Sequence, residues 1–324
     1  MPAPQVSVVI RCCNEEEHIG RLLSGILEQS VSDVDIVVVD SGSTDATLAI
    51  ASRYPVTVRH IGRHEFTFGR SLNIGCAAAR GDYIVIASAH VYPVYRDWLA
   101  KMLAPFSDPD IGLVYGQQRG DQRTKYSERQ IFEKLYPDGA ARRTGGLFCN
   151  NANAAIRRTL WQSQPYDESL TGLEDLAWAK AIAQLGHGVC YQGEGSVVHV
   201  HDERWRQICN RYRREAIALQ SIVPDERFGM LDFLRCLVGN VWSDLRHAHR
   251  EACLRAVWSE VLSFRLMQFW GTYSGYRTGE QLSDSLKQTF YYPKGWSHAP
   301  DLHPADQRAG LRIPYASLVD EDET

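Results

Sequence analysis

The sequence predicts an α/β protein in which a doubly wound, mostly parallel sheet is followed by a helical region. Two observations support this fold class. In the first part of the chain, short apolar runs alternate four times with segments of helical pattern, and the runs are continuously hydrophobic, as in strands buried on both faces. After residue 203 the strand-like runs stop, and the hydrophobic spacing becomes helical.

The alternating elements come first in the chain. Apolar side chains at Ile19, Leu22, Leu23, Ile26 and Leu27 recur with the period of an amphipathic helix. The other segments are assigned in the same way, from apolar runs and from the turn residues that bound them. In chain order, the expected elements are strand 6–10, helix 19–27, strand 35–40, helix 45–53, strand 56–60, helix 71–79 and a strand within 81–93.

The following segments, up to residue 203, are less regular. Their expected elements are a helix at 98–103, strands at 111–116, within 148–156, at 189–191 and at 197–200, and a helix that opens at 173–178. Two basic stretches, 117–129 and 142–146, are polar or rich in glycine, which is typical of loops or lids.

Composition places the chain among ordinary folded proteins. It has 324 residues, 44% of them hydrophobic, and its net charge of −4 argues against a nucleic-acid partner. The eight cysteines form no CxxC pair, so we expect no zinc site of that kind and reduced cysteines in the cytoplasm. A strand-like run by Val6 leaves no room for a signal peptide, and no apolar run reaches the ~18 residues of a membrane span.

The pattern predicts three regions: a domain at 1–203, a helical region at 204–290, and an extended or disordered tail at 291–324. From Arg204 to Arg277 there are 12 arginines, no lysine and seven acidic residues, a net charge of +5. The aromatic residues of this region either form a core between helices or, with the arginines, a face that rests on an anionic membrane. The helices could equally join two copies into a homo-oligomer.

A first candidate site follows the apolar run of 83–87. Ser88, Ala89 and His90 come where this strand is expected to end. In open α/β sheets, ligands bind beyond the carboxyl ends of the strands. His90 is therefore either part of a site or a strand-end histidine with a satisfied hydrogen bond.

Four motifs, in order, resemble the family 2 glycosyltransferases, which have a GT-A fold. The motifs are Val6–Ile10 with Asn14–Glu16, Val38–Thr47, Asn73–Gly75, and Ala79–Ile84. The order and spacing match over about the first 200 residues. Within the family, the Asp40–Ser43 form and His64–Phe66 look most like the rhamnosyltransferase branch. The resemblance implies that 1–203 is a GT-A domain that binds a nucleotide sugar and inverts its anomeric centre.

The resemblance also implies roles for individual residues. Asp40, at a strand end, would accept hydrogen bonds from a nucleobase or ribose, with Asn14 to Glu16 beside it; alternatively, Asp40 only shapes the turn. The general base is expected at the acid pair Glu174–Asp175, with Asp175 preferred. The alternative is that both are solvated acids in the first turn of a helix, where its dipole favours them.

The chain departs from the family pattern twice. Ser88-Ala89-His90 replaces the usual metal-binding carboxylates, and Leu72 replaces a common arginine. We therefore expect His90, with His199 or His201, to hold a divalent ion, Mn²⁺ in preference to Mg²⁺. The alternative is that His90 donates directly to the phosphates without a metal.

The remaining predicted contacts complete the site. The diphosphate charge would be balanced by cations, most of them in a closing loop: Arg70, Arg119, Arg123 and Lys125. Further donor contacts are expected at Asn14, Glu16, Asp40, Ser41, Asn73, Ser88 and Ala89. Acceptor contacts are expected at Trp98, Asn151 and Asn153.

The leading hypothesis is a transferase that extends a glycan or lipid-linked acceptor in cell-surface polysaccharide synthesis, in the cytoplasm or on the inner face of the membrane. One alternative is a sugar-phosphate nucleotidyltransferase, which would need a Gly-rich phosphate loop; here Glu15 to Glu17 would repel phosphate instead. The other is an inactive nucleotide-sugar-binding module, which the missing metal carboxylates favour and the retained acid pair Glu174–Asp175 argues against.

Overall fold

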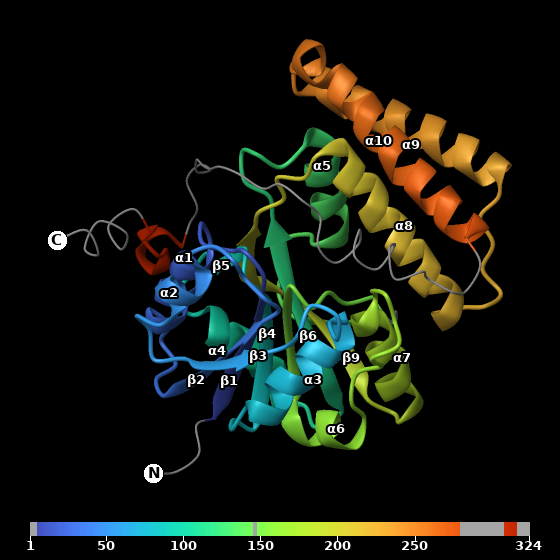
Figure 1. Cartoon of the computed structure of the whole chain (residues 1–324). Coiled ribbons are helices and arrows are strands. Elements are labelled where there is room, and N and C mark those ends of the chain that lie inside the picture. Colours follow the sequence, from blue (N-terminus) through green and yellow to red (C-terminus); the bar gives the residue numbers. More distant parts are fainter. Residues whose placement is uncertain (1–4, 145–147, 279–307, 316–324) are drawn as a thin grey trace.

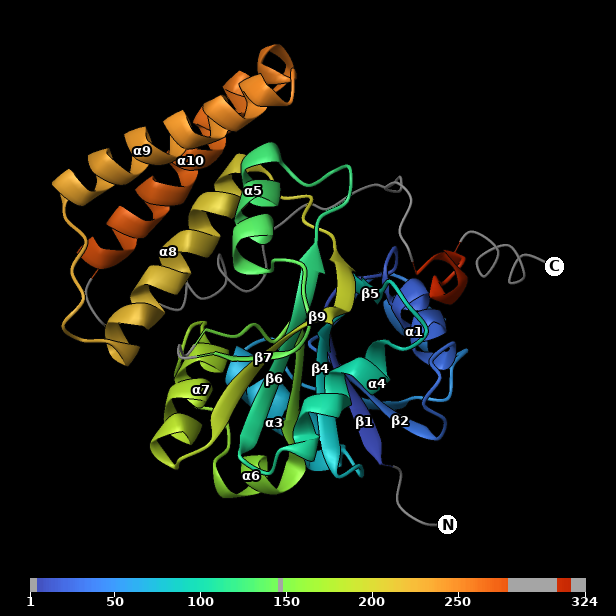
Figure 2. The same cartoon turned by 180° about the vertical axis from the view of Figure 1, so that it is seen from behind.

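The computed structural model describes residues 5–144, 148–278 and 308–315 (Figure 1). Its centre is a nine-stranded sheet with the order β3-β2-β1-β4-β8-β6-β9-β5, and β7 pairs with β9. Helices cover both faces of the sheet, and a group of long helices from the C-terminal part stands beside one end of it (Figure 2).

The N-terminal half of the sheet is parallel. Its strands are β1 (Val6–Cys12), β2 (Val34–Asp40), β3 (Thr57–His60) and β4 (Tyr83–Ser88). The helices between them are α1 (Ile19–Leu27), α2 (Thr47–Ala51) and α3 (Phe68–Ala78). Successive side chains of a strand point to opposite faces, so Val8 packs in the core that contains α1, and Val9 packs in the core that contains Leu72 of α3. This arrangement confirms the doubly wound α/β class.

The second half of the sheet is mixed. The antiparallel strand β8 (Asn153–Arg157) joins β4 to β6 (Ile111–Arg119), and β6 is parallel to β9 (Gly188–His199). Two short strands, β5 (Val91–Pro93) and β7 (Arg142–Thr144), run antiparallel to β9. The helices here are α4 (Trp98–Leu103), α5 (Tyr126–Leu135), α6 (Arg158–Ser163) and α7 (Glu174–Gln184).

Some expected element boundaries were wrong. The two strands at 189–191 and 197–200 are one strand, β9, because the polar and glycine-rich break between them is absorbed by a register shift against β6 between Gly116 and Gln118. The strand expected within 148–156 is present as β8, which begins at Asn153. Part of the basic stretch at 142–146 is strand β7, and the rest lies outside the described residues.

The basic stretch 117–129 is not the open loop that the sequence indicated. Strand β6 extends to Arg119, and α5 already begins at Tyr126. In the short turn between them, Asp121 accepts hydrogen bonds from the backbone and the Nε of Arg123, and both side chains are largely buried. The turn is therefore held by its own ion pair in this structure, and its role as a lid stays a prediction.

The helical region is confirmed as α8 (Trp205–Ile222), α9 (Met230–Arg250) and α10 (Leu254–Arg277). None of the helices among the described residues is long and apolar enough to cross a membrane. In the expected tail, only 308–315 is described: Arg312 bridges to Tyr95, and Tyr315 Oη donates to the Pro93 carbonyl. This segment contains a short 3₁₀ helix, Ala309–Leu311, so it is not extended throughout, and the other tail residues lie outside the described part.

Candidate active site

The loops that follow β1 and β2 are bound to each other at the carboxyl edge of the sheet. Asn14, in a left-handed conformation with φ of 56°, accepts a hydrogen bond from Thr44 N, and Glu16 accepts one from Ala46 N. The backbone N–H groups of 14, 15 and 16 donate in return to side chains of the β2 loop. Asn14 and Glu16, which were predicted to contact the nucleotide-sugar donor, thus fix the conformation of the two loops at this edge.

Asp40 shapes the turn after β2. Its carboxylate accepts from the backbone N–H groups of Gly42 and Ser43, and it is 2% exposed. Ser41 is also buried, and its hydroxyl donates to the Cys12 carbonyl. The turn-forming interpretation of Asp40 is confirmed; contact of Asp40 or Ser41 with a nucleotide stays a prediction.

The predicted acid pair opens α7 and lies against two other strands. Glu174 accepts from Arg11 Nη1, at the end of β1, at 3.1 Å. Asp175 accepts from the backbone N–H of Asn151, just before β8, at 3.0 Å, and from Leu176 N at 2.8 Å. Both acids are buried, which excludes the interpretation that they are solvated surface charges.

The environment of Asp175 gives its carboxyl the acidity of a general base. Burial, which disfavours the charged form, and the neighbouring Glu174 raise the pKa of Asp175 to about 7. The two backbone N–H groups oppose this effect because they stabilise the carboxylate. A base with a pKa near neutrality is ionised often enough to act and basic enough to accept a proton.

The three predicted metal-binding histidines come together. Strand β5 begins beside the end of β9, so His90 lies next to His199 with their rings stacked 5.1 Å apart. His199 and His201 approach with their Nε2 atoms 2.9 Å apart. One ligand nitrogen from each of the three lies within 4.8 Å of the other two.

Each of these imidazoles is held through its Nδ1. His90 Nδ1 lies 2.8 Å from Glu15 Oε1, His199 Nδ1 lies 2.6 Å from Gln118 Oε1, and His201 Nδ1 lies 2.7 Å from Glu128 Oε1. Histidines that bind metals usually use one ring nitrogen as the ligand while an oxygen orients the other. The donor set and its supports therefore fit a divalent cation.

The pKa values of His199 and His90 are shifted in opposite directions. Burial and His201 lower the pKa of His199 well below its usual value, so this ring stays neutral and able to bind a metal. Burial alone would lower the pKa of His90, but the charge and hydrogen bond of Glu15 outweigh it and raise that pKa. The carboxylate of Glu15 is thus the strongest local charge on His90.

The predicted phosphate-binding cations do not gather at one point. Arg70 pairs with Glu65 and Glu168, Arg119 pairs with Asp138, and Arg123 pairs with Asp121. Lys125 lies over the ring of Trp205 at 5.2 Å. Three of the four cations are thus paired with acids in this structure, and contact of the four with a diphosphate stays a prediction.

Two arginines that were not predicted as site residues lie close to the acid pair and to the histidine cluster. Arg11 contacts Glu174, and Arg211 of α8 contacts both Glu128 and Glu203, so it joins the helical region to the support of His201. Arg11 could have been found, since it ends the first predicted strand. Arg211 could not, because nothing in the spacing of α8 marks one arginine among several.

Three predicted contacts prove to be structural. Trp98 and Asn153 are 0% exposed, and Trp98 Nε1 donates to Asn153 Oδ1, so neither offers surface to an acceptor in this structure. Asn73 binds Tyr166 and Trp161 and so holds the segment before α7. Asn151, by contrast, contacts both acids, through its backbone N–H to Asp175 and through Nδ2 to Glu174 at 3.4 Å.

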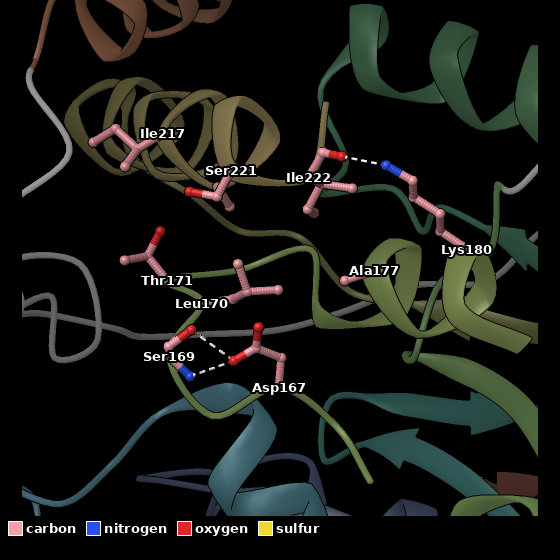
Figure 3. A pocket seen from close by; sticks show the side chains of 10 residues that line it. Asp167, Ser169, Leu170, Thr171, Ala177, Lys180, Ile217, Ser221 and Ile222 are labelled. Atoms are coloured by element: carbon pink, nitrogen blue, oxygen red, sulfur yellow. Dashed lines mark hydrogen bonds between the residues drawn. The ribbon is translucent and has the colours of Figure 1, made fainter. Parts of the chain in front are cut away.

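Ser88 and Ala89 stay at the end of β4. Ala89 is fully buried, whereas Ser88 is half-buried and its backbone N donates to the Ala152 carbonyl at 3.4 Å; contact of either residue with a donor stays a prediction. A separate cavity of about 250 Å³ lies between the segment before α7 and helix α8, next to Lys180, whose Nζ donates to the Ile222 carbonyl (Figure 3). It is lined by neither the acid pair nor the histidines.

A known protein family matches the part of the chain that forms most of the carboxyl edge of the sheet. Residues 7–162 match the model of the family "Glycosyl transferase family 2". This part of the chain matches a family 2 glycosyltransferase domain. Strands β2, β3, β4 and β8 and all of β1 except Val6 lie inside the matched range, as do Arg11, His90 and Asn151, whereas α7 and the end of β9 lie beyond it.

Two relatives are named as O-antigen chain rhamnosyltransferases. RfbN of Salmonella typhimurium is 25% identical over 221 residues, which are 64% of this chain and 70% of RfbN. WbaN of Salmonella anatum is 28% identical over 196 residues, which are 57% of this chain and 62% of WbaN. The match thus spans less than two thirds of WbaN.

Solved structures confirm the GT-A fold. Mannosyltransferase PcManGT from Pyrobaculum calidifontis, in complex with GDP-Man and Mn²⁺, has a TM-score of 0.56 and 20% identity over 90% of this chain and 88% of its own. Glucosyl-3-phosphoglycerate synthase from Mycobacterium tuberculosis, in complex with Mn²⁺, UDP and its product, has a TM-score of 0.51 and 21% identity over 69% and 81%.

Proposed function

We propose that this protein is an inverting glycosyltransferase that moves a hexosyl group from a nucleoside-diphosphate sugar to a glycan or lipid-linked acceptor in cell-surface polysaccharide synthesis, in the cytoplasm or on the inner face of the membrane. The observation that carries the proposal is the buried pair Glu174–Asp175 at the ligand-binding edge of a glycosyltransferase domain. The names of RfbN and WbaN support the polysaccharide setting.

The chemistry assigned to the pair is a single displacement. Asp175 takes the proton of the acceptor hydroxyl while that oxygen forms a bond to the anomeric carbon, and the nucleoside diphosphate leaves from the opposite side. The hydrogen bonds from Asn151 and Leu176 fix the orientation of the Asp175 carboxyl. Glu174, paired with Arg11, keeps the proton affinity of Asp175 high. Attack from the side opposite the leaving group inverts the anomeric centre.

His90, His199 and His201 are the residues that would hold a divalent cation. When bound, such a cation would supply positive charge for the diphosphate leaving group. The presence of Mn²⁺ in the PcManGT and glucosyl-3-phosphoglycerate synthase complexes supports this assignment. Imidazole ligands favour Mn²⁺ over Mg²⁺, which prefers oxygen ligands.

A donor screen tests the proposal. The purified chain is incubated with UDP-, dTDP-, GDP- and CDP-sugars and Mn²⁺ but without acceptor, and the released nucleotide is identified. Slow release of a nucleoside diphosphate from one class of donor is expected. Binding without release would indicate an inactive module, and nucleoside triphosphate formed with added pyrophosphate would indicate a nucleotidyltransferase. With an acceptor, a product that retains the anomeric configuration of the donor would overturn the inverting mechanism.

A further inference from the structure

Helices α9 and α10 carry rows of apolar side chains that stay exposed in the described structure, although Trp270 of the α10 row also lies against Phe233 of α9, with ring centroids 6.0 Å apart. On α9 the row contains Leu231, Leu234, Val238 and Trp242, and on α10 it contains Trp258, Leu262, Leu266 and Trp270. Within each row the spacing is three or four residues, so the side chains share one side of their helix. Leu231 is 83% exposed, and Trp242 is 69% exposed.

These rows are not the faces that hold the two helices in the fold. Ala248 of α9 and Val261 of α10 are fully buried, and they pack with Tyr126 of α5. Asp244 and Arg265 are buried on the same side, where Ser127 of α5 contacts them. On the helical wheel the exposed rows are centred about 100° away from these buried positions, so they are turned away from α5. The α9–α10 hairpin thus has a second apolar face.

The charges around this second face are mostly positive. Five arginines of the hairpin are exposed: Arg235, Arg246, Arg250, Arg255 and Arg277. Its exposed acids, among the described residues, are Asp232 and Glu251. Asp232 accepts a hydrogen bond from Gly229 N, and Glu251 accepts one from Tyr126 Oη, so both are engaged by the protein itself.

We propose that the second face of the α9–α10 hairpin docks on an anionic lipid bilayer, with both helices lying in the plane of the interface. The tryptophans and aliphatic side chains would enter the boundary between headgroups and acyl chains, and the arginines would contact anionic headgroups. Charge complementarity selects this occupant, since the arginines of two copies would repel each other across a symmetric contact. The proposal is independent of the transferase chemistry, because docking requires no turnover.

Vesicle sedimentation tests the docking surface with the full chain. Vesicles of phosphatidylcholine alone are compared with vesicles that contain 30% phosphatidylglycerol. The wild type is expected to sediment with the anionic vesicles and to be released as salt rises. The double variant Arg235→Gln/Arg246→Gln should bind roughly 25-fold more weakly, since each arginine near the surface contributes about fivefold. Trp242→Ser/Trp258→Ser should weaken binding by roughly tenfold or more.

Matched controls come from exposed leucines on the catalytic domain. Leu27 is 52% exposed and Leu185 is 57% exposed, so Leu27→Ser/Leu185→Ser removes a comparable apolar surface away from the hairpin and should leave binding unchanged. All variants change exposed side chains, and circular dichroism confirms that they fold. Equal binding by the tryptophan variant and the leucine control would overturn the proposal. So would a wild type that ignores anionic vesicles and forms a dimer which the tryptophan variant abolishes.

Discussion

At the scale of single residues, Asp175 shows how position sets chemistry. It occupies the first turn of α7, where a helix dipole favours a negative charge, yet burial and Glu174 dominate and raise its pKa to about 7. Burial therefore has the larger effect at this helix end. Because the neutral form predominates below pH 7, the carboxyl is able to act as a base only as the pH rises through this value.

Replacing Asp175 tests that assignment. Asp175→Asn should lower transfer by roughly 10²- to 10⁴-fold while donor affinity changes little. In the wild type, transfer should fall about tenfold per pH unit below about 7, because the base is then protonated. The variant should lose this pH dependence. Initial rates from pH 5 to 9 measure both effects, and near-normal transfer by Asp175→Asn would shift the assignment to Glu174.

Asp175→Asn also has an expected effect on stability. A carboxyl with a raised pKa destabilises the folded state once the pH exceeds the unfolded value, and the penalty is complete above the folded pKa of about 7. The asparagine removes that penalty, so its Tm relative to the wild type should be higher at pH 8 than at pH 4. A variant with lower activity and unchanged or higher Tm at pH 8 has lost the base and not the fold.

The histidine cluster yields a second prediction at this scale. EDTA should abolish transfer, and Mn²⁺ should restore it better than Mg²⁺. Titration of Mn²⁺ by calorimetry in the presence of a nucleoside diphosphate provides a readout independent of activity: His90→Ala should bind at least about tenfold more weakly. His60→Ala, which changes an exposed histidine beside Asp40, is the control. Full activity in EDTA would instead support direct donation from His90 to the phosphates.

At the scale of elements, helix α3 depends on small residues to approach the sheet. A Cβ added to Gly75 would lie 2.3 Å from Val9 Cγ1 and 3.0 Å from Val39 Cγ2, so the helix would have to move. Gly75→Ala should therefore destabilise the protein by about 1–3 kcal/mol. Gly239, in α9, has no atom within 4 Å of such a Cβ, and Gly239→Ala should stabilise by about 0.5–1 kcal/mol. Thermal melting compares the two, and a similar Tm change in both would contradict the close packing of α3.

Some of the helices and strands could be predicted from the sequence, and others could not. Helix α4 at 98–103 and strands β1, β2 and β4 followed from local patterns, because a buried strand or an amphipathic turn is written in adjacent residues. The single strand β9 did not, since its continuity depends on pairing with β6, which is distant in sequence. The roles of Trp98 and Asn153 failed for the same reason: only the fold shows that each binds the other in the core.

The candidate site also contains residues that local sequence could predict and residues that only the fold reveals. The acid pair Glu174–Asp175 and the three histidines were predictable as candidate site residues, because they follow strand ends or open a helix in a recognisable order. Their supports, Gln118 for His199 and Glu128 for His201, were not, since these residues come from β6 and α5 and carry no local signal. The acid partners of Arg70, Arg119 and Arg123 were not predictable either, because those acids carry no local signal, and a role of these cations in phosphate binding stays a prediction.

At the scale of the whole molecule, a buried ion pair within the helical region makes hydrogen bonds with helix α5. Arg265 of α10 donates through Nε and Nη2 to both oxygens of Asp244 of α9, at 2.7 and 3.0 Å, and Ser127 of α5 donates to the same carboxylate. Asp244 is 0% exposed, and Arg265 is 2% exposed. Three helices therefore share one charge-paired contact in a region from which water is excluded.

This contact predicts a specific pattern in a double-mutant cycle. Asp244→Ala leaves the Arg265 guanidinium buried without its carboxylate and should cost about 3–5 kcal/mol, whereas Asp232→Ala, at an exposed acid of the same helix, should cost about 1 kcal/mol or less. The pair Asp244→Leu/Arg265→Met replaces both charges with apolar groups of similar volume and should recover most of the loss, because the penalty comes from the unpaired charge. The single variants Asp244→Leu and Arg265→Met complete the cycle, and thermal unfolding of all these chains and the wild type measures it. If the double variant were less stable than Asp244→Ala, the pair would instead be a net source of stability, and the attachment of α9 and α10 would depend on its charge.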